Sequence, residues 1–445
     1  MTEGISWTLH PGAEGLVKVL QRRLLGDNRA AREFGEKLSR QTSTRMMDWI
    51  DHIRIPAGWI DIDDLLKTGF ERDPDIEIDD ATCYRAPGSM LPPIILGEDK
   101  IARLLIKVED LDTFISANGA RKEPRGKKHS ALRYIVLSRE NNVHFGGIER
   151  RGYRGFIEKE EDDTDAYLKT RDALGRRERT GFDENMALEE LLSRLREYKK
   201  DLHVSRVADV FFRTERRYWE SRDPDALRQL RRQNTLGLGW GNRDHHTYRN
   251  SRENLKTVVS ILEEIGMVPR ERFYAGEQAG WGAQVLEHED LDTVVFADVD
   301  MEPVEKDGDF AHAGLKGRDE LGTVGLWVAL HGESMLEAGL HHLAARVDFM
   351  TYNERARSEG NAPMDPFSSF PHLKQCFTKG VNWKIDPKRG RSLLDGNRIT
   401  QEQFSIFTTS GARGSHLELI ERNQGFKGFN QSAVSDIIRR TDPRR

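Results

Sequence analysis

The sequence predicts an α+β protein of four βαβββ units, arranged as two tandem halves that a charged helical connector joins. Short runs rich in Ile, Val and Leu alternate with single amphipathic helices. The segment IERRGYRGF (148–156) recurs, with one residue inserted, as IERNQGFKGF (420–429). Between the two halves, residues 157–235 change to longer, charged helical patterns.

Composition limits the classes of function. The 445 residues include 69 Lys and Arg against 74 Asp and Glu, a net charge of −5, so no basic excess is present to bind nucleic acid. No apolar run approaches the roughly 18 residues that a membrane span needs. Only two cysteines occur, Cys83 and Cys376, and no apolar run follows Met1, so we expect a cytoplasmic protein. The sequence leaves a homodimer open.

The N-terminal half is expected to contain a helical cap and the first pair of units. Residues 1–44 should form the cap, because apolar side chains recur there at helical spacing. Residues 45–156 should form a βαβββ pair, with strands at WIDHIRI, MLPPIIL, ARLLIKV and LRYIVLS and a helix at VEDLDTFISANG. Residues 157–235 open with the acidic run EKEEDDTD and should form the connector.

The C-terminal half, residues 236–445, should contain the second pair. Its first unit is expected to have a strand at RDHHTYR, the helix SRENLKTVVSILEEIG, and strands at RERFYAG, AQVLEHE and TVVFADVD. Its second unit should begin with a strand at LHHLAARV, continue with a helix near residues 350–358, and close with strands at EQFSIFTTS and SHLELIER. A C-terminal helix should follow as a lid.

Three residues of this half are candidate metal ligands: His245, His342 and Glu418. The two histidines open the first strands of the two units and the glutamate lies on the last strand, so all three side chains can point into one cup. Two imidazoles and one carboxylate leave open positions on an octahedral ion, which suits non-haem Fe(II) and its oxygen chemistry. Mn(II), Co(II) and Zn(II) remain alternatives.

The repeat provides an internal comparison. Aligning the two copies places Gly146 where Glu418 stands and Arg103 where His342 stands, and only His52 is kept. We therefore expect the N-terminal pair to be metal-free.

Other polar residues have simpler interpretations. His246 and His341 adjoin the proposed ligands, and strand alternation sends neighbours to opposite faces, so we expect them in packing or on the surface. Asp298 and Asp300 form a D-x-D pattern that could bind metal, although an exposed strand end is the simpler explanation. His416 is either a barrel-facing residue or a partner of the metal ligands.

The segment SLLDGNRITQEQFSIFTTSGARGSHLELIERNQGFKGFN (392–430) resembles the C-terminal signature of the 4-hydroxyphenylpyruvate dioxygenase group, in the vicinal oxygen chelate superfamily. The resemblance implies a strand before the ligand glutamate, here Glu418, and a G-x-K-G-F entry to a lid helix, here ending at Phe429. It also implies His245 and His342 as ligands, Fe(II), and a 2-oxo acid substrate with O2.

A second resemblance concerns the 2-oxoadipate dioxygenase/decarboxylase family of the same superfamily. In that family a substrate-binding arginine follows a ligand histidine by four residues, as Arg249 follows His245 here, and EEIGMVPRERFY resembles the turn after its helix. On a strand the two side chains share a face, about 13 Å apart at ~3.3 Å per residue. Arg249, or Arg346 on the facing strand, is thus a candidate to hold a substrate carboxylate; a structural ion pair is the alternative.

These observations predict a non-haem Fe(II)-dependent dioxygenase that oxidatively decarboxylates a small 2-oxo acid and hydroxylates the product. Both families share the 2-oxo acid and differ in the rest of the substrate. The same cup would also serve a ring-cleaving dioxygenase, an isomerase or a lyase. A non-catalytic binding module would keep the fold without the metal.

Overall fold

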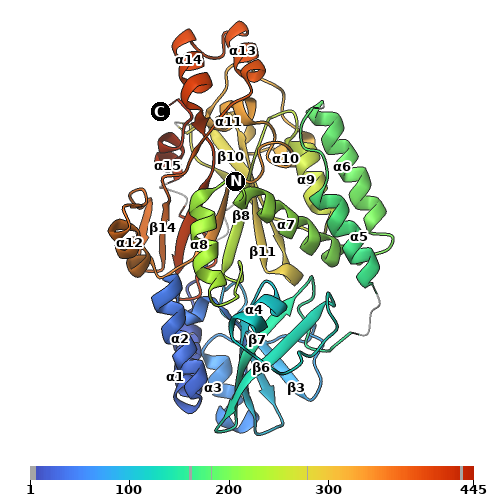
Figure 1. The fold of residues 1–445 in the computed structure, drawn as a ribbon, viewed down its shortest axis with the longest axis vertical. Coiled ribbons are helices and arrows are strands. Elements are labelled where there is room, and N and C mark those ends of the chain that lie inside the picture. Colours follow the sequence, from blue (N-terminus) through green and yellow to red (C-terminus); the bar gives the residue numbers. More distant parts are fainter. Residues whose placement is uncertain (1–6, 160–162, 182, 278, 431–433, 445) are drawn as a thin grey trace.

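Two mixed β-sheets, one in each half of the chain, form the framework of the molecule (Figure 1). The computed structural model describes residues 7–159, 163–181, 183–277, 279–430 and 434–444, so part of the acidic run EKEEDDTD lies outside the described residues. The N-terminal sheet lies at the bottom of Figure 1 and the C-terminal sheet above it.

The N-terminal sheet has seven strands in the order β2-β3-β4-β1-β5-β7-β6. The central strands of its two units, β1 and β5, are antiparallel neighbours, and each is also joined to the last strand of its own unit in parallel. The elements are β1 (Ile50–Pro56), α3 (Ile62–Lys67), β2 (Glu71–Arg72), β3 (Ala81–Arg85), β4 (Ile94–Gly97), β5 (Ala102–Lys107), α4 (Leu111–Ala117), β6 (Leu132–Glu140) and β7 (Val143–Arg150).

The C-terminal sheet has eight strands in the order β13-β14-β17-β12-β8-β11-β10-β9, which repeats the same plan. Its first unit contains β8 (Arg243–Asn250), α9 (Leu255–Glu264), β9 (Val268–Tyr274), β10 (Trp281–His288) and β11 (Thr293–Asp300). Its second unit contains β12 (His342–Arg346), α12 (Phe349–Ser358), β13 (Ser368–Phe370), β14 (Leu373–Phe377) and β17 (His416–Arg422). The expected tandem α+β plan is confirmed, except that the unit from β5 to β7 has two strands after its helix instead of three.

Insertions decorate the C-terminal half. They comprise α10 (Phe310–Ala313), α11 (Thr323–His331), α13 (Pro387–Asp395), α14 (Gln401–Ser410) and the small sheet of β15 (Asn382–Trp383) and β16 (Ala412–Arg413). The last helix is α15 (Val434–Arg440).

The duplication is visible in a buried polar motif that occurs once in each half. In the C-terminal half, Asp244 accepts hydrogen bonds from His245 Nδ1 at 3.0 Å and from Arg422 Nε at 2.8 Å. In the N-terminal half, Asp51 stands at 2.7 Å from Nδ1 of its neighbouring histidine and at 2.8 Å from Nε of Arg150. Because the same aspartate, histidine and arginine meet at matching strand positions, the repeat is one of structure as well as of sequence.

Helices outside the sheets pack mainly on one half each. The N-terminal helices α1 (Pro11–Asp27) and α2 (Arg29–Thr42) share the apolar core of the N-terminal sheet. The helices α5 (Thr164–Gly175), α6 (Glu184–Tyr198) and α7 (Val204–Glu220) contribute side chains to the core of the C-terminal sheet, and α6 packs against α9. The next helix, α8 (Pro224–Asn234), contacts both α2 and β17.

One expected strand is wrong. The segment EQFSIFTTS lies in helix α14, not in a strand before the glutamate. Thr400 caps this helix in a reciprocal arrangement with Gln403, and Phe407 is buried in a small apolar cluster with the side chains of α13 and α11. The capping box and this cluster outweigh the strand preference of the β-branched and aromatic residues.

Among the described residues, no helix has both the length and the apolar character that crossing a bilayer requires.

Candidate metal centre

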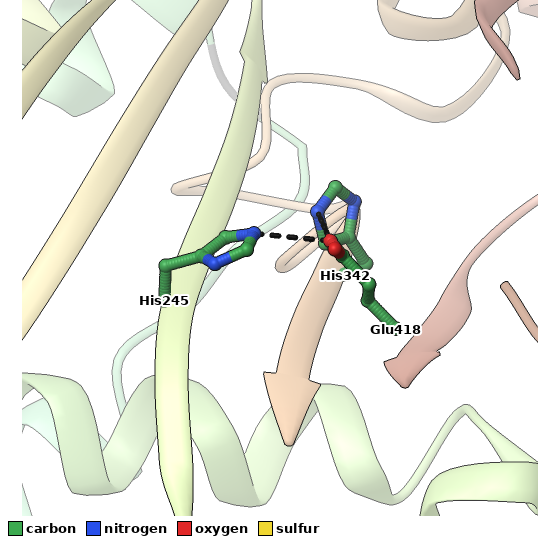
Figure 2. A group of neighbouring side chains, drawn as sticks. All are labelled: His245, His342 and Glu418. Atoms are coloured by element: carbon green, nitrogen blue, oxygen red, sulfur yellow. Dashed lines mark hydrogen bonds and ion pairs between the residues drawn. The ribbon is translucent and has the colours of Figure 1, made fainter. Parts of the chain in front are cut away.

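The side chains of His245, His342 and Glu418 converge on one point in the C-terminal half (Figure 2). Oε2 of Glu418 lies 3.0 Å from Nε2 of His245 and 3.1 Å from Nε2 of His342. One ligand atom from each of the three residues lies within 4.8 Å of the others, and all three residues are buried. Within the described residues, no other group of this kind is present.

Three adjacent strands place these side chains. Strand β12 lies between β8 and β17, so His342 stands between the strands that carry the other two residues. His342 pairs with Thr247 of β8 and Ala344 pairs with Glu418 of β17. Side chains that share a face of neighbouring strands point the same way, and this register directs all three into one cup.

Neighbouring groups hold the three side chains in place. Asp244 orients His245 through Nδ1, and Gln375 Nε2 donates to Glu418 Oε1 at 2.7 Å. Nδ1 of His341 lies 2.9 Å from Nδ1 of His342. Each candidate ligand thus has one atom held by the protein and another facing the common point.

Burial and mutual charge determine the protonation of the group. Burial disfavours the imidazolium of His245, but the carboxylates of Glu418 and Asp244 outweigh burial and raise its pKa to about 9. Burial lowers the pKa of His342. Burial alone would raise the pKa of Glu418, but the adjacent histidines hold it well below its usual range. A proton therefore occupies the group in the absence of a cation.

This donor set fits a divalent transition metal. Two imidazole nitrogens and a carboxylate oxygen facing one point are the protein ligands of facial two-histidine, one-carboxylate sites. Neighbouring ligands of an octahedral ion with bonds of ~2.1 Å lie ~3 Å apart, which matches the two distances from Glu418. His245, His342 and Glu418 would hold the ion, and the buried group is a candidate divalent metal site.

The group forms one wall of a small cavity of about 80 Å³. Aromatic rings form much of the remaining wall: the Phe429 ring lies 4.5 Å from that of Phe296, and both rings contact the His245 ring. Phe429 precedes α15, whose residues Ile437 and Ile438 also line the cavity, while residues 431–433 lie outside the described part of the chain. The cavity is therefore enclosed by apolar groups on the side facing this helix.

The two candidate arginines lie in different surroundings. Arg249 lines the cavity, is 1% exposed, and has no hydrogen-bond partner in the described structure for Nε and Nη1. Burial lowers its pKa to about 10. Arg346 does not line the cavity; its Nε donates to Asp244 at 3.1 Å, and it borders the cleft between the two halves. Of the two, only Arg249 can meet a molecule bound beside the metal group.

The matching cup of the N-terminal half has a different lining. The pairing of β5 with β7 places Arg103 and Gly146 at the positions that correspond to His342 and Glu418. Arg103 and Arg54 both pair with Asp99 there, at 3.0 and 3.3 Å. A guanidinium therefore stands where the C-terminal half has an imidazole.

The structure decides the surroundings of several polar residues that the sequence left open or misplaced. Asp298 and Asp300 are buried, so the expected exposed strand end is wrong, and Asp298 lines the cavity with its pKa raised by burial to about 7. His341 contacts a candidate ligand, although alternation suggested packing or surface. His416 is the register partner of His342, packs against Phe377 and lies near His341, but it does not line the cavity. Only the spatial pairing of strands could have identified these residues.

No model of a known protein family matches the sequence, and no curated protein matches it. Solved structures with similarity include a triple mutant of 4-hydroxymandelate synthase from Streptomyces coelicolor, at 11% identity over 89% of this chain and 98% of that chain, with a TM-score of 0.28. Methylmalonyl-CoA epimerase from Mycobacterium tuberculosis aligns at 14% identity over 41% and 87%, with a TM-score of 0.24. The uncharacterized protein YdcJ from Shigella flexneri aligns at 15% identity over 53% and 73%, with a TM-score of 0.25.

Proposed function

We propose that this chain is a non-haem Fe(II)-dependent dioxygenase that oxidatively decarboxylates a 2-oxo acid and hydroxylates the product. One observation carries the proposal: a buried two-histidine, one-carboxylate group lines a small cavity together with an arginine whose Nε and Nη1 have no hydrogen-bond partner among the described residues. When bound, Fe(II) would activate O2 and offer positions for the carboxylate and keto oxygens of the substrate.

The residues of this chain have distinct tasks in that reaction. Arg249 binds and orients a second carboxylate of the substrate, because its guanidinium is buried with free donors inside the cavity. Phe296 and Phe429 exclude water from the space beside His245. Gln375 and Asp244 keep Glu418 and His245 directed at the common point.

The test begins with metal content. Protein reconstituted without oxygen should bind about one Fe(II) per chain, and His245→Ala, His342→Ala and Glu418→Ala should each lose most of it. Glu421→Gln is the matched control, since Glu421 is a buried carboxylate of the same strand that accepts a hydrogen bond from Lys374 instead. Full metal content in all three ligand variants would refute the site.

The reaction is then tested with a panel of linear 2-oxo acids, with and without a terminal carboxylate. The proposal predicts O2 consumption and CO2 release in equal amounts with the correct substrate. Turnover that needs the metal but no O2 would assign the site to an isomerase or lyase. Metal binding without turnover of any panel member under O2 would count against the 2-oxo acid.

A further inference from the structure

Two oppositely charged side chains line the cavity without pairing with each other. Arg249 on β8 and Asp298 on β11 are direct partners in the parallel register of the two strands. They are 1% and 4% exposed. Within the described residues, neither Nε nor Nη1 of Arg249 nor Oδ1 of Asp298 has a hydrogen-bond partner. The remaining nitrogen of Arg249, Nη2, donates only a long hydrogen bond, 3.4 Å to Thr441 Oγ1. Buried charged groups with unsatisfied donors and acceptors are strongly disfavoured, so the arrangement needs a reason.

Other buried carboxylates near the cavity are fully hydrogen-bonded within the protein. Asp244 is held by Arg422 Nε and Nη2 at 2.8 and 2.9 Å. Asp300, two residues beyond Asp298 on the same strand, accepts hydrogen bonds from the backbone N–H groups of three residues at the start of α11: Gly322, Val324 and Gly325. These buried carboxylates are satisfied by the protein, whereas that of Asp298 faces the cavity.

We propose that Arg249 and Asp298 form a subsite for an α-amino acid group at the distal end of the substrate. The carboxylate of that group meets the guanidinium of Arg249, and its ammonium group meets the carboxylate of Asp298. The other end of the substrate is the 2-oxo acid of the proposed function, on which this assignment of the whole substrate rests.

Charge balance favours this ligand. With the carboxylate of Asp298 ionised, as an adjacent ammonium group would favour, Arg249 and Asp298 together are neutral, and a zwitterionic group is also neutral, so binding leaves neither a surplus nor an unpaired ion in the cavity. A carboxylate alone would satisfy Arg249 and leave Asp298 unpaired, and an amine alone would do the reverse. The subsite therefore selects a group that carries both charges on neighbouring atoms.

Position and size limit the substrate further. Arg249 stands two residues beyond Thr247, which pairs with His342, so the subsite adjoins the metal group inside one cavity. Because the subsite and the metal group line the same small cavity, the linker between the two ends of the substrate must be short. We infer a small 2-oxo acid whose far end is an amino acid.

The subsite can be tested with probes that lack the 2-oxo acid group: pentanoate, which carries only the carboxylate, and 2-aminopentanoate in both enantiomers. Their dissociation constants would be measured by calorimetry on the full-length protein, both Zn(II)-loaded and metal-free. One enantiomer of 2-aminopentanoate should bind about tenfold or more tightly than pentanoate in both forms. In the metal-free protein, chelation contributes nothing to this preference.

Variants assign the preference to the two residues. Asp298→Asn should reduce the preference for 2-aminopentanoate over pentanoate to less than about twofold, while pentanoate still binds. Arg249→Met should weaken the binding of both probes about tenfold or more. Asp300→Asn is the matched control, because it alters a buried carboxylate of the same strand that the protein satisfies; the preference should remain.

Three results would overturn the subsite: equal affinity of the two probes for the wild-type protein, a preference that survives Asp298→Asn, or no binding of either probe. The comparison of the two probes uses the wild-type protein, so it does not depend on whether any variant folds. Because the probes lack the 2-oxo acid and require no O2, these outcomes are independent of whether the protein consumes O2 with 2-oxo acids.

Discussion

Nδ1 of His341 lies 2.9 Å from Nδ1 of His342, so one imidazole donates an N–H to the other. If Nε2 of His342 binds a metal ion, the proton of His342 must be on Nδ1, and His341 accepts it. His341 would then hold His342 as Asp244 holds His245, although with a neutral ring in place of a carboxylate. The remaining N–H of His341 would be on Nε2, which has no partner among the described residues.

The first prediction follows from this pair. His341→Phe should weaken binding of Zn(II) or Co(II) by about 10-fold to 100-fold, the usual effect of losing a group that orients a ligand. His341→Gln should recover much of the affinity, because its carbonyl oxygen can accept the same hydrogen bond. Metal titration against a competing chelator measures both. His416→Gln removes a nearby buried imidazole and serves as the control; equal affinities in all four proteins would refute the role of His341.

A second prediction uses the duplication as its own control. Asp244→Asn should weaken metal binding by about 10-fold to 100-fold, because it removes the carboxylate that orients His245. Asp51→Asn makes the same change in the N-terminal copy, which has Arg103 and Gly146 at the other two positions, and should leave metal affinity unchanged. Both variants should lower stability, since each removes a buried carboxylate that pairs with an arginine. A similar loss of metal in both variants would show an indirect effect on folding.

Metal binding should strengthen as the pH rises. The pKa of His245 is raised from 6.5 to about 9 by the carboxylates of Glu418 and Asp244, against the effect of burial, and this proton must leave before Nε2 can bind a cation. Affinity should therefore increase about tenfold per pH unit across this interval and level off above it.

The same pKa shift should make the metal-free protein less stable as the pH rises. Because the folded pKa is above the unfolded value, the stabilisation by protonated His245 is fully present below about pH 6.5 and is lost as the pH rises through about 9. Thermal unfolding of the metal-free protein and chelator competition at several pH values measure the two effects. Metal affinity that does not change with pH would show that His245 is not protonated in the metal-free protein.

Arg249 should matter for the substrate more than for the metal. Arg249→Lys keeps the charge but loses the planar pair of donors, so it should raise KM or lower kcat/KM by about one to two decades while iron content stays normal. Arg252→Lys is a suitable control, because Arg252 pairs with Glu305 outside the cavity. Unaltered kinetics of Arg249→Lys on the true substrate, or loss of iron, would place Arg249 in the scaffold instead.

Phe429 should protect the reaction from water. Its ring covers His245 and Phe296, so Phe429→Ala should increase O2 consumption relative to product formed. Phe156 packs against His52 in the N-terminal copy as Phe429 packs against His245, and Phe156→Ala should leave the ratio unchanged. The ratio of O2 consumed to product is the measurement, and an unchanged ratio in Phe429→Ala would argue against a cover.

Much of the framework could be predicted from the sequence because it depends on local pattern. The alternation of strand and helix follows from the spacing of apolar residues, and the two copies of the I-E-R segment indicate the duplication. The alignment of these copies also favoured His245 and His342 over the neighbouring histidines, since matching positions in a repeated strand point the same way, and Glu418 was chosen from its place on the last strand. The prediction from local pattern was wrong at residues 402–410, where a capping box and a small apolar cluster stabilise helix α14 in place of a strand.

The sequence by itself thus determined the unit, its repetition and the three residues that converge. Only the tertiary structure decided which groups the neighbouring polar side chains contact. Arg346 donates a hydrogen bond to Asp244, and His341 forms one with His342. The side chain of Asp298 lines the cavity beside Arg249. The direction of a polar side chain depends on the strands that become its neighbours and on their register. Those neighbours come from distant parts of the chain, so no local spacing specifies them.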